Sequence, residues 1–285
     1  MMFLALLISQ LLAQASPSTV WEKVQNARRD SPIEALSMAD QHQSKAFFRD
    51  ILLEAQKGQI NQSLRTRAST LGLHLRIEED FAYLWDRTGS AGLYVVRLGP
   101  AENIILQAPH SFFDLGTGRL VSLLLEQGPY RAAFFNTTHR YGQAGLTPEE
   151  RPETPPDLAH LATTHFQAAT LGASEAFTNL SVVQLHGFRS REGESAVVTS
   201  GSALQPAGFL ASFRTGLSDL MEDIGPVLNA KHRPELAAKR NVQGRLLSSR
   251  SVFLHVELSK PARDKLNSNA TLLEDLSQLI VETCQ

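Results

Sequence analysis

The hydrophobic residues of this chain fall into two kinds of run. Between residues 71 and 108 they form short stretches, rich in β-branched and aromatic side chains and broken by glycine and proline, which predict strands. Further along, strand-like runs alternate with segments of helical period. The expected strands are LHLRI, FAYLWD, GLYVVRL, NIILQA, RAAFFN, LSVVQLHGF, AVVTSG and SVFLHVEL. The expected helices are Leu120–Gln127, Leu158–Leu171, Phe209–Met221 and Ala270–Glu282.

This alternation predicts an α/β fold, with a mixed, mostly parallel sheet sandwiched by helices. Residues 20–66 are rich in helix-forming side chains, with Ser31 and Pro32 placed to begin a helix, and predict one or two amphipathic helices. We therefore expect an N-terminal helical lead-in at residues 16–70, followed by an α/β domain at 71–285. The lead-in could shield an active site, dock a partner or complete the core.

The first 15 residues, MMFLALLISQLLAQA, contain no charged side chain and end in Ala-Gln-Ala. Their apolar stretch is shorter than the roughly 20 residues that a membrane-spanning helix needs. A signal peptide cleaved after Ala15 is the interpretation that fits, and it predicts a secreted or periplasmic protein without a stable membrane span after cleavage. Because this segment has no Lys or Arg, a retained anchor is the alternative.

Charge and cysteine content narrow the possible functions. The formal net charge is −2, so the chain lacks the basic excess that nucleic-acid binding requires. Its single cysteine, Cys284, can form no internal disulfide, so the fold must be stabilised by its core. A serine hydrolase is disfavoured because no Gly-x-Ser-x-Gly elbow is present.

Candidate chemistry lies at three strand ends. His110 follows a buried run and precedes Asp114 by four residues, His186 ends the run SVVQLH, and Glu257 lies between two apolar neighbours in a strand. Core histidines bonded to backbone carbonyls and a solvent-facing carboxylate are the plainer explanations. Catalytic zinc, however, takes three protein ligands and leaves a position for water, and the water needs a general base. The set predicts His110, Asp114 and His186 as zinc ligands and Glu257 as the base.

Several motifs add a resemblance to this inventory. LQAPHSFFD, AFFNTTHR, HLATTHFQAA, VVQLHGF and FLHVELSKPAR, in this order, resemble the N-formylglutamate amidohydrolase and poly-γ-glutamate hydrolase group, which is related to zinc carboxypeptidases. The resemblance runs from about residue 95 to 265. It implies a zinc-dependent hydrolase that cleaves an amide bond next to a glutamate-like, carboxylate-bearing group in a small molecule or peptide. It also implies the same three zinc ligands and the same catalytic glutamate, with Arg263 as the arginine that follows it.

The resemblance further implies substrate-binding residues. Asn136 and Arg140 match a segment that holds a substrate carboxylate, for which the planar fork of arginine is suited. His165 matches a histidine of the amidohydrolases, with a helix-surface histidine as the plainer explanation. Arg245 is a second candidate partner for an anion, or else a solvated loop arginine.

One departure from the group concerns the first pair of ligands. Carboxypeptidases use His-x-x-Glu, whereas here the spacing is longer and the acid is Asp114; Glu126 is the alternative ligand. This departure keeps a second function open, namely an exported binding protein on the same scaffold with a degenerate metal site.

Overall fold

The computed structural model describes residues 18–29, 33–86, 92–142, 145–146, 157–189, 192–201, 205, 208–247 and 251–285. The predicted signal peptide and the helix start at Ser31 and Pro32 lie outside these residues. Among the residues described, no helix combines the length and the apolar character that crossing a membrane requires.

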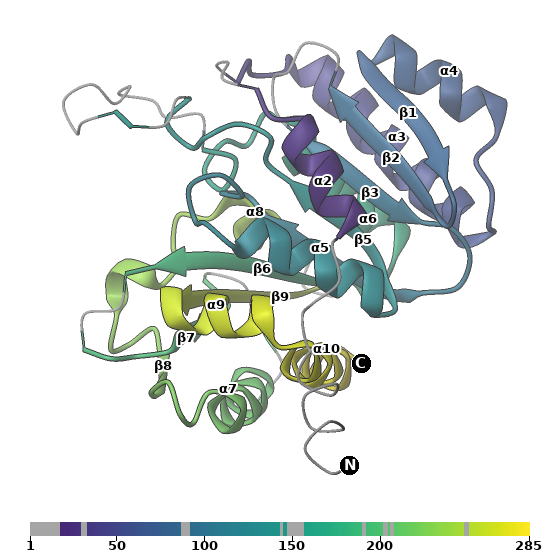
Figure 1. Ribbon diagram of the computed structural model, residues 1–285. Helices are drawn as coiled ribbons and strands as arrows, with labels where there is room; N and C mark the ends of the chain where they lie inside the picture. The colour runs from purple at the N-terminus through teal and green to yellow at the C-terminus, as the bar shows by residue number, and fades with distance from the viewer. Residues whose placement is uncertain are drawn as a thin grey trace, which may run out of the picture.

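One sheet runs through the described part of the chain (Figure 1). Its strands are β1 (Leu73–Glu78), β2 (Phe81–Asp86), β3 (Leu93–Arg97), β4 (Glu102–Ala108), β5 (Tyr130–Phe135), β6 (Ser181–Phe188), β7 (Ala196–Thr199), β8 (Val227–Asn229) and β9 (Val252–Ser259). They lie in the order β1-β2-β3-β5-β4-β6-β9-β7-β8. The central strands β5, β4, β6 and β9 are parallel, while β3 and β7 join them antiparallel.

Helices cover both faces of this sheet. They are α2 (Thr19–Asn26), α3 (Met38–Gln56), α4 (Gln62–Thr70), α5 (Thr117–Gln127), α6 (His165–Ala176), α7 (Phe209–Leu220), α8 (Val242–Leu246), α9 (Lys260–Ser268) and α10 (Ala270–Cys284). Successive strand residues point to opposite faces. Leu106 therefore belongs to the core cluster that includes residues of α2, α5, α7, α9 and α10, and its neighbour Ile105 belongs to the cluster that includes residues of α3, α4 and α6. The predicted mixed sheet sandwiched by helices is confirmed.

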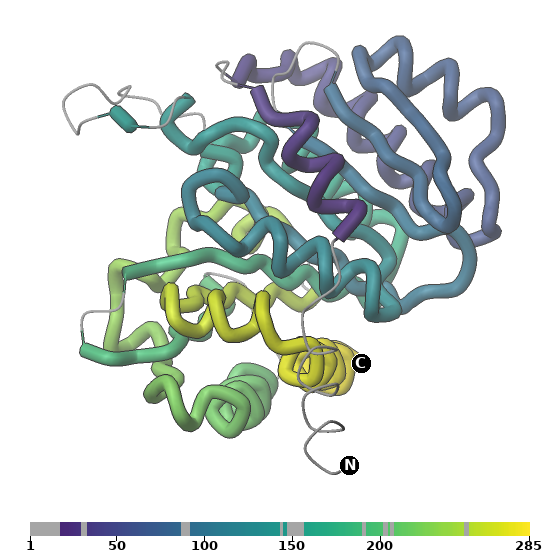
Figure 2. Tube along the Cα trace, in the orientation of Figure 1, coloured from purple at the N-terminus to yellow at the C-terminus, as the bar shows by residue number. Residues whose placement is uncertain are grey.

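The helices of the predicted lead-in pack on both faces. Helix α2 lies against α5, and α3 lies along α6 (Figure 1). Gly172 of α6 allows a close approach, since a Cβ there would lie 2.6 Å from the backbone oxygen of Lys45. Phe47, Phe48 and Ile51 of α3 are fully buried. These helices thus contribute directly to the core. At the other end of the chain, α10 lies beside α7 (Figure 2).

Some elements differ from the sequence-based expectations. Helix α6 begins at His165, not at Leu158, because Thr164 caps it by accepting a hydrogen bond from the backbone of Gln167. Strand β8 and helices α8 and α9 were not predicted. Helix α9 does carry a start signal, since Ser259 is its N-cap and Pro261 lies in its first turn.

Candidate metal centre

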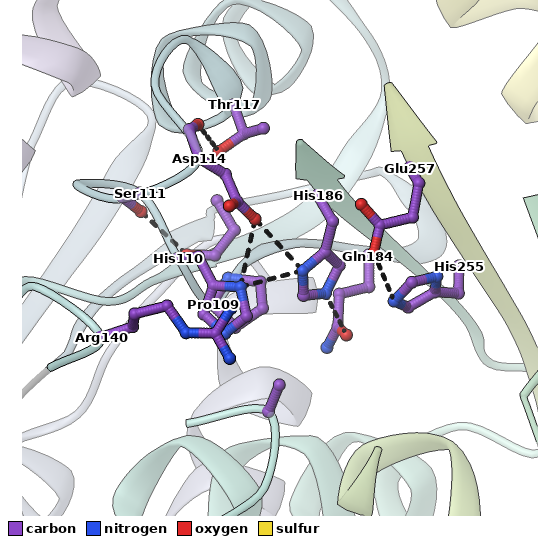
Figure 3. Close-up of polar contacts among 12 residues, drawn as sticks. Pro109, His110, Ser111, Asp114, Thr117, Arg140, Gln184, His186, His255 and Glu257 are labelled. Carbon is purple, nitrogen blue, oxygen red and sulfur yellow. Dashed lines mark hydrogen bonds and ion pairs between the residues drawn. The ribbon is translucent and has the colours of Figure 1, made fainter. Parts of the chain in front are cut away.

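Strand register brings four polar side chains of β6 and β9 together. The two strands are parallel neighbours, and Gln184 pairs with His255 while His186 pairs with Glu257. Alternate residues share a face, so all four point toward the side of the sheet that α3 and α6 cover. Figure 3 shows these four side chains beside one another. His186 and Glu257 lie near the carboxyl ends of their strands, where α/β proteins place binding sites.

The turn after β4 supplies the next two side chains. The backbone N–H groups of Phe113 and Asp114 donate to the carbonyl oxygen of His110, at 2.9 and 2.8 Å. The hydroxyl of Ser111 donates to the carbonyl of Ala108 at 2.8 Å. These bonds close a helical turn, which places residues four apart on one side. His110 and Asp114 therefore face the same point.

Three metal-ligating atoms meet at this point. The Nδ1 of His110 lies 3.1 Å from Oδ2 of Asp114 and 3.1 Å from Nδ1 of His186, and the third edge, His186 Nδ1 to Asp114 Oδ2, is 3.3 Å. All three side chains are buried. Tetrahedral zinc ligands at about 2.0–2.2 Å from the ion lie roughly 3.3–3.6 Å from one another. The triangle is thus close to the size that a zinc ion needs.

The far nitrogen of each histidine is also occupied. Nε2 of His110 lies 2.8 Å from Oδ1 of Asp157, and Nε2 of His186 lies 2.8 Å from Oε1 of Gln184 (Figure 3 shows the latter). Metal-ligating histidines commonly donate their other N–H to such acceptors. When both rings are neutral and each Nε2 donates, as metal binding requires, each Nδ1 presents a lone pair beside the carboxylate of Asp114. Three acceptors facing one another are an arrangement that a cation satisfies.

Charges at the site perturb several pKa values. Burial alone would lower the pKa of His110, but the carboxylates of Asp157 and Asp114 raise it to about 9. Burial opposes the ionisation of these two carboxyls, yet His110 holds the pKa of both well below the usual range. Burial lowers the pKa of His186 to about 4. Binding of a metal ion would displace the proton shared by these groups.

A cavity of about 530 Å³ opens at the triangle. Its lining includes the three triangle residues, Glu257 and most of the segment from Pro234 to Asn241. Burial, followed by the charge of Asp114, raises the pKa of Glu257 to about 8 against the opposing effect of His110 and Arg140. A carboxyl whose pKa lies near neutrality can both accept and donate a proton.

His255 was not among the sequence-based candidates. It is buried, stacks on His186 with ring centroids 4.4 Å apart, and its Nδ1 has no hydrogen-bond partner among the described residues. Together with His186 and Glu257 it forms a second group of metal-ligating type. His186 can serve only one of the two groups, because its Nε2 already faces Gln184. The tighter triangle with His110 and Asp114 is the stronger metal site.

Arg140 is the predicted substrate-binding residue that the structure brings to the cavity. Its Nη2 lies 2.5 Å from Oδ2 of Asp157, and its guanidinium packs 5.1 Å from the ring centre of Phe113. Asn136 has a different role, since it donates to the carbonyl of Pro109 and accepts from the backbone of Thr138. It therefore supports the turn that carries His110.

Arg263 lies beneath the site and is not part of the cavity lining. Its guanidinium donates to the carbonyl oxygens of Leu115 and Leu258. Gly187 makes room for it, because a Cβ at that position would lie 2.4 Å from Arg263 Nη1. Its described contacts thus support two backbone segments beside the site.

The other candidates lie away from the cavity. His165 contacts the hydroxyl of Ser44 at 2.8 Å, beneath α3, and Arg245 is exposed on α8 outside the cavity lining. The alternative ligand, Glu126, accepts hydrogen bonds from Val20 and the adjacent Thr19 at the start of α2. The structure therefore places Asp114, and not Glu126, at the histidines.

Comparisons with known proteins return structural matches. No family model and no curated protein matches the chain. A bacteriophage poly-γ-glutamate hydrolase is 16% identical and covers 68% of this chain and 87% of its own, with a TM-score of 0.45. An N-formylglutamate amidohydrolase from Ralstonia eutropha JMP134 is 15% identical, with coverages of 68% and 97% and a TM-score of 0.44. A succinylglutamate desuccinylase from Vibrio parahaemolyticus is 14% identical, with coverages of 82% and 81% and a TM-score of 0.45. Both groups that the sequence motifs resemble are among these structures.

Proposed function

We propose that this protein is an exported zinc-dependent hydrolase that cleaves an amide bond next to a glutamate-like, carboxylate-bearing group. The observation that supports it most directly is the buried triangle of His110, Asp114 and His186 at a cavity that Glu257 also lines. The choice of substrate rests on the sequence motifs and on Arg140 in the cavity lining.

The residues divide into ligands and a base. His110, Asp114 and His186 would hold the zinc ion through the three atoms that form the triangle. Bound zinc supplies Lewis-acid polarisation of the amide carbonyl and makes water more acidic. Glu257 takes one proton from the attacking water as the C–O bond forms. It returns this proton to the amide nitrogen as the C–N bond breaks, which yields a carboxylic acid and an amine, and the acid then gives its proton to the amine so that a carboxylate and an ammonium group leave.

Arg140 would bind the carboxylate of the substrate. Arg140 lines the cavity and its side chain is 22% exposed, so a substrate in the cavity can reach it. Its ion pair with Asp157, through Nη2, holds the guanidinium in place. Such a contact orients the substrate toward the reacting centre, which lowers the entropic part of the barrier.

Metal content and activity of the mature chain, residues 16–285, test the proposal. We expect about one zinc ion per chain by elemental analysis, hydrolysis of N-acyl-glutamates or γ-glutamyl peptides, and loss of zinc in His186→Ala. Glu257→Gln should keep the zinc and lose roughly 10²–10⁴-fold in kcat, the usual contribution of a general base. Glu126→Gln, the same chemical change away from the cavity, should keep both.

Two results would contradict the proposal. A wild-type chain that takes up no zinc even after incubation with it would make the triangle a set of buried polar residues. A chain that holds zinc but hydrolyses neither substrate class would be the exported binding protein instead.

A further inference from the structure

A network of buried side-chain amides lies beside the metal centre. Its members come from β4, β6, α6 and the start of α8, and their side chains are between 0% and 2% exposed. They are Gln107, Gln167, Gln184, Asn241 and Gln243. Gln184 lies at the centre, because it contacts three of the others and also the metal-ligand candidate His186. We call these five residues the amide network.

The first anchor of the amide network is a backbone carbonyl. Gln243 places its Nε2 2.9 Å from the carbonyl oxygen of Leu158, which can only accept. The amino group of Gln243 must therefore face Leu158, and its Oε1 must face Gln184. At 3.3 Å from this oxygen, the group that Gln184 presents must be its own amino group.

Two further anchors give the side-chain amide of Gln184 the same orientation. The backbone N–H of Gly244 donates to Oδ1 of Asn241 at 3.1 Å, so Asn241 turns its amino group toward Oε1 of Gln184, at 2.5 Å. On the opposite side, the hydroxyl of Thr170 donates to a backbone carbonyl at 2.9 Å and can only accept from Gln107, also at 2.9 Å. Oε1 of Gln107 then accepts from Nε2 of Gln184 at 2.8 Å. All three anchors therefore orient Gln184 identically.

We infer that Gln184 is a positioning residue that sets the tautomer of His186. The oriented amide presents an oxygen, and only an oxygen, to Nε2 of His186 at 2.8 Å. The Nδ1 side also faces an acceptor, Oδ2 of Asp114, but at the longer distance of 3.3 Å and next to Nδ1 of His110 at 3.1 Å. The shorter contact to Gln184 therefore favours the proton on Nε2, with the Nδ1 lone pair facing His110. Three backbone groups and one hydroxyl thus fix the orientation of the acceptor that favours Nδ1 as the metal-binding nitrogen.

The same oxygen also reaches the cavity wall. Asn241 lines the cavity and shares Oε1 of Gln184 with His186. The segment that ends at Asn241 is therefore hydrogen-bonded, through a single amide, to a residue of the triangle. The tautomer follows from the protein alone, whereas its value for metal binding rests on the proposed function.

The tautomer can be measured directly in the wild-type, metal-free protein. With ¹⁵N-labelled histidine, long-range ¹H–¹⁵N correlation spectra at pH 7 distinguish a proton on Nε2 from one on Nδ1. The His186 signals are identified by their absence in His186→Gln. We expect the proton of His186 on Nε2. A proton on Nδ1 would overturn the inference, and this measurement does not depend on zinc uptake or on hydrolysis.

A pair of matched variants tests the consequence. Gln184→Met removes the acceptor with little change in volume, and Gln167→Met makes the same change at a member of the amide network that does not contact Gln184 or His186. Competition with a chromophoric chelator should show zinc binding about 10–100-fold weaker in Gln184→Met, the usual effect of removing a partner of a ligating histidine. Gln167→Met should stay within about twofold of wild type. Equal affinities in the two variants would refute the positioning role. If Gln184→Met fails to fold, the wild-type tautomer decides.

Discussion

Replacing Asp157 should weaken the metal centre without touching a ligand. Both carboxylate oxygens of this buried residue are in use: Oδ1 accepts from Nε2 of His110 at 2.8 Å and from the backbone of Ala159 at 3.0 Å, and Oδ2 faces Arg140 at 2.5 Å and His160 at 3.2 Å. In Asp157→Asn, the amide oxygen can keep the Oδ1 contacts. The amino group is then turned against the donors of Arg140 and His160, so the ion pair is lost.

The size of the effect follows from these contacts. Asp157→Asn retains an acceptor for His110 but loses its charge, and neutral hydrogen bonds are about half as strong as charged ones. We expect zinc binding to weaken about tenfold, or ~1.4 kcal/mol, near the lower end for such partners. Asp157→Ala removes the acceptor and should approach 100-fold, or ~2.7 kcal/mol.

Stability should change less than for a fully buried ion pair. Breaking such a pair costs about 3–5 kcal/mol. Here the side chains of Arg140 and His160 are 22% and 42% exposed, so water can solvate them once the carboxylate is gone. We expect the metal-free protein to lose about 1–3 kcal/mol in the free energy of unfolding after this allowance for exposure.

The assays are chelator competition for zinc and urea denaturation of the metal-free protein. Asp264→Asn is the matched control, because Asp264 is exposed and its described partner is Lys260 four residues away. Its effect should stay within about 0.5 kcal/mol. If Asp157→Ala bound zinc as tightly as the wild type, the role of Asp157 in orienting His110 would be refuted. If Asp264→Asn lost as much zinc affinity or stability as the Asp157 variants, the effect would not be specific.

Three further predictions concern stability and the thiol. Glu126→Ala should lower the free energy of unfolding by about 0.5–2 kcal/mol, as the loss of a helix cap does, with zinc affinity unchanged; weaker zinc binding would contradict its placement at α2. Gly187→Ala places a Cβ 2.4 Å from Arg263 Nη1 and should cost about 1–3 kcal/mol in urea denaturation, so an unchanged midpoint would show that Arg263 can move aside. Burial raises the pKa of Cys284 to about 12, against about 8.5 in the unfolded chain. As the pH rises from 8 to 10, the native thiol therefore stays protonated while the unfolded one ionises. An aromatic disulfide reagent should then react slowly with the native protein and rapidly in urea, and equal rates would contradict this.

Glu257 shows what the alternating strand pattern predicts about a side chain and what it does not. Period-two alternation correctly places it on the face opposite Val256 and Leu258, which pack in the core beneath α9. The plainer explanation of that position was a carboxylate that faces solvent. The structure shows instead a cavity and a carboxyl that is 8% exposed, because helices cover both faces of the sheet. The side of the sheet that Glu257 faces was predictable from the sequence, but the helices and the cavity on that side were not.

The arginine candidates show a different limit. Arg140 lines the cavity, whereas Arg263 donates to backbone carbonyls and Arg245 is exposed on a short helix. An arginine in the sequence predicts a planar set of N–H donors, but backbone carbonyl oxygens can accept from these donors as well as a ligand carboxylate can. Which acceptor lies nearby depends on how loops from distant parts of the chain come together.

The sequence by itself determined the features that depend on near neighbours: most of the strands and helices, the mixed sheet, and the placing of His110 and Asp114 four residues apart just after a buried strand. Only the tertiary structure decided that His186 joins them, because this needs the order and register of β4 and β6. It also decided that Asp157, 47 residues from His110, and Asn241, 57 residues from Gln184, complete the surroundings of the histidines. Local periodicity reports which face a side chain takes, but hydrogen-bond partners far apart in the chain are chosen by the packing of the whole core.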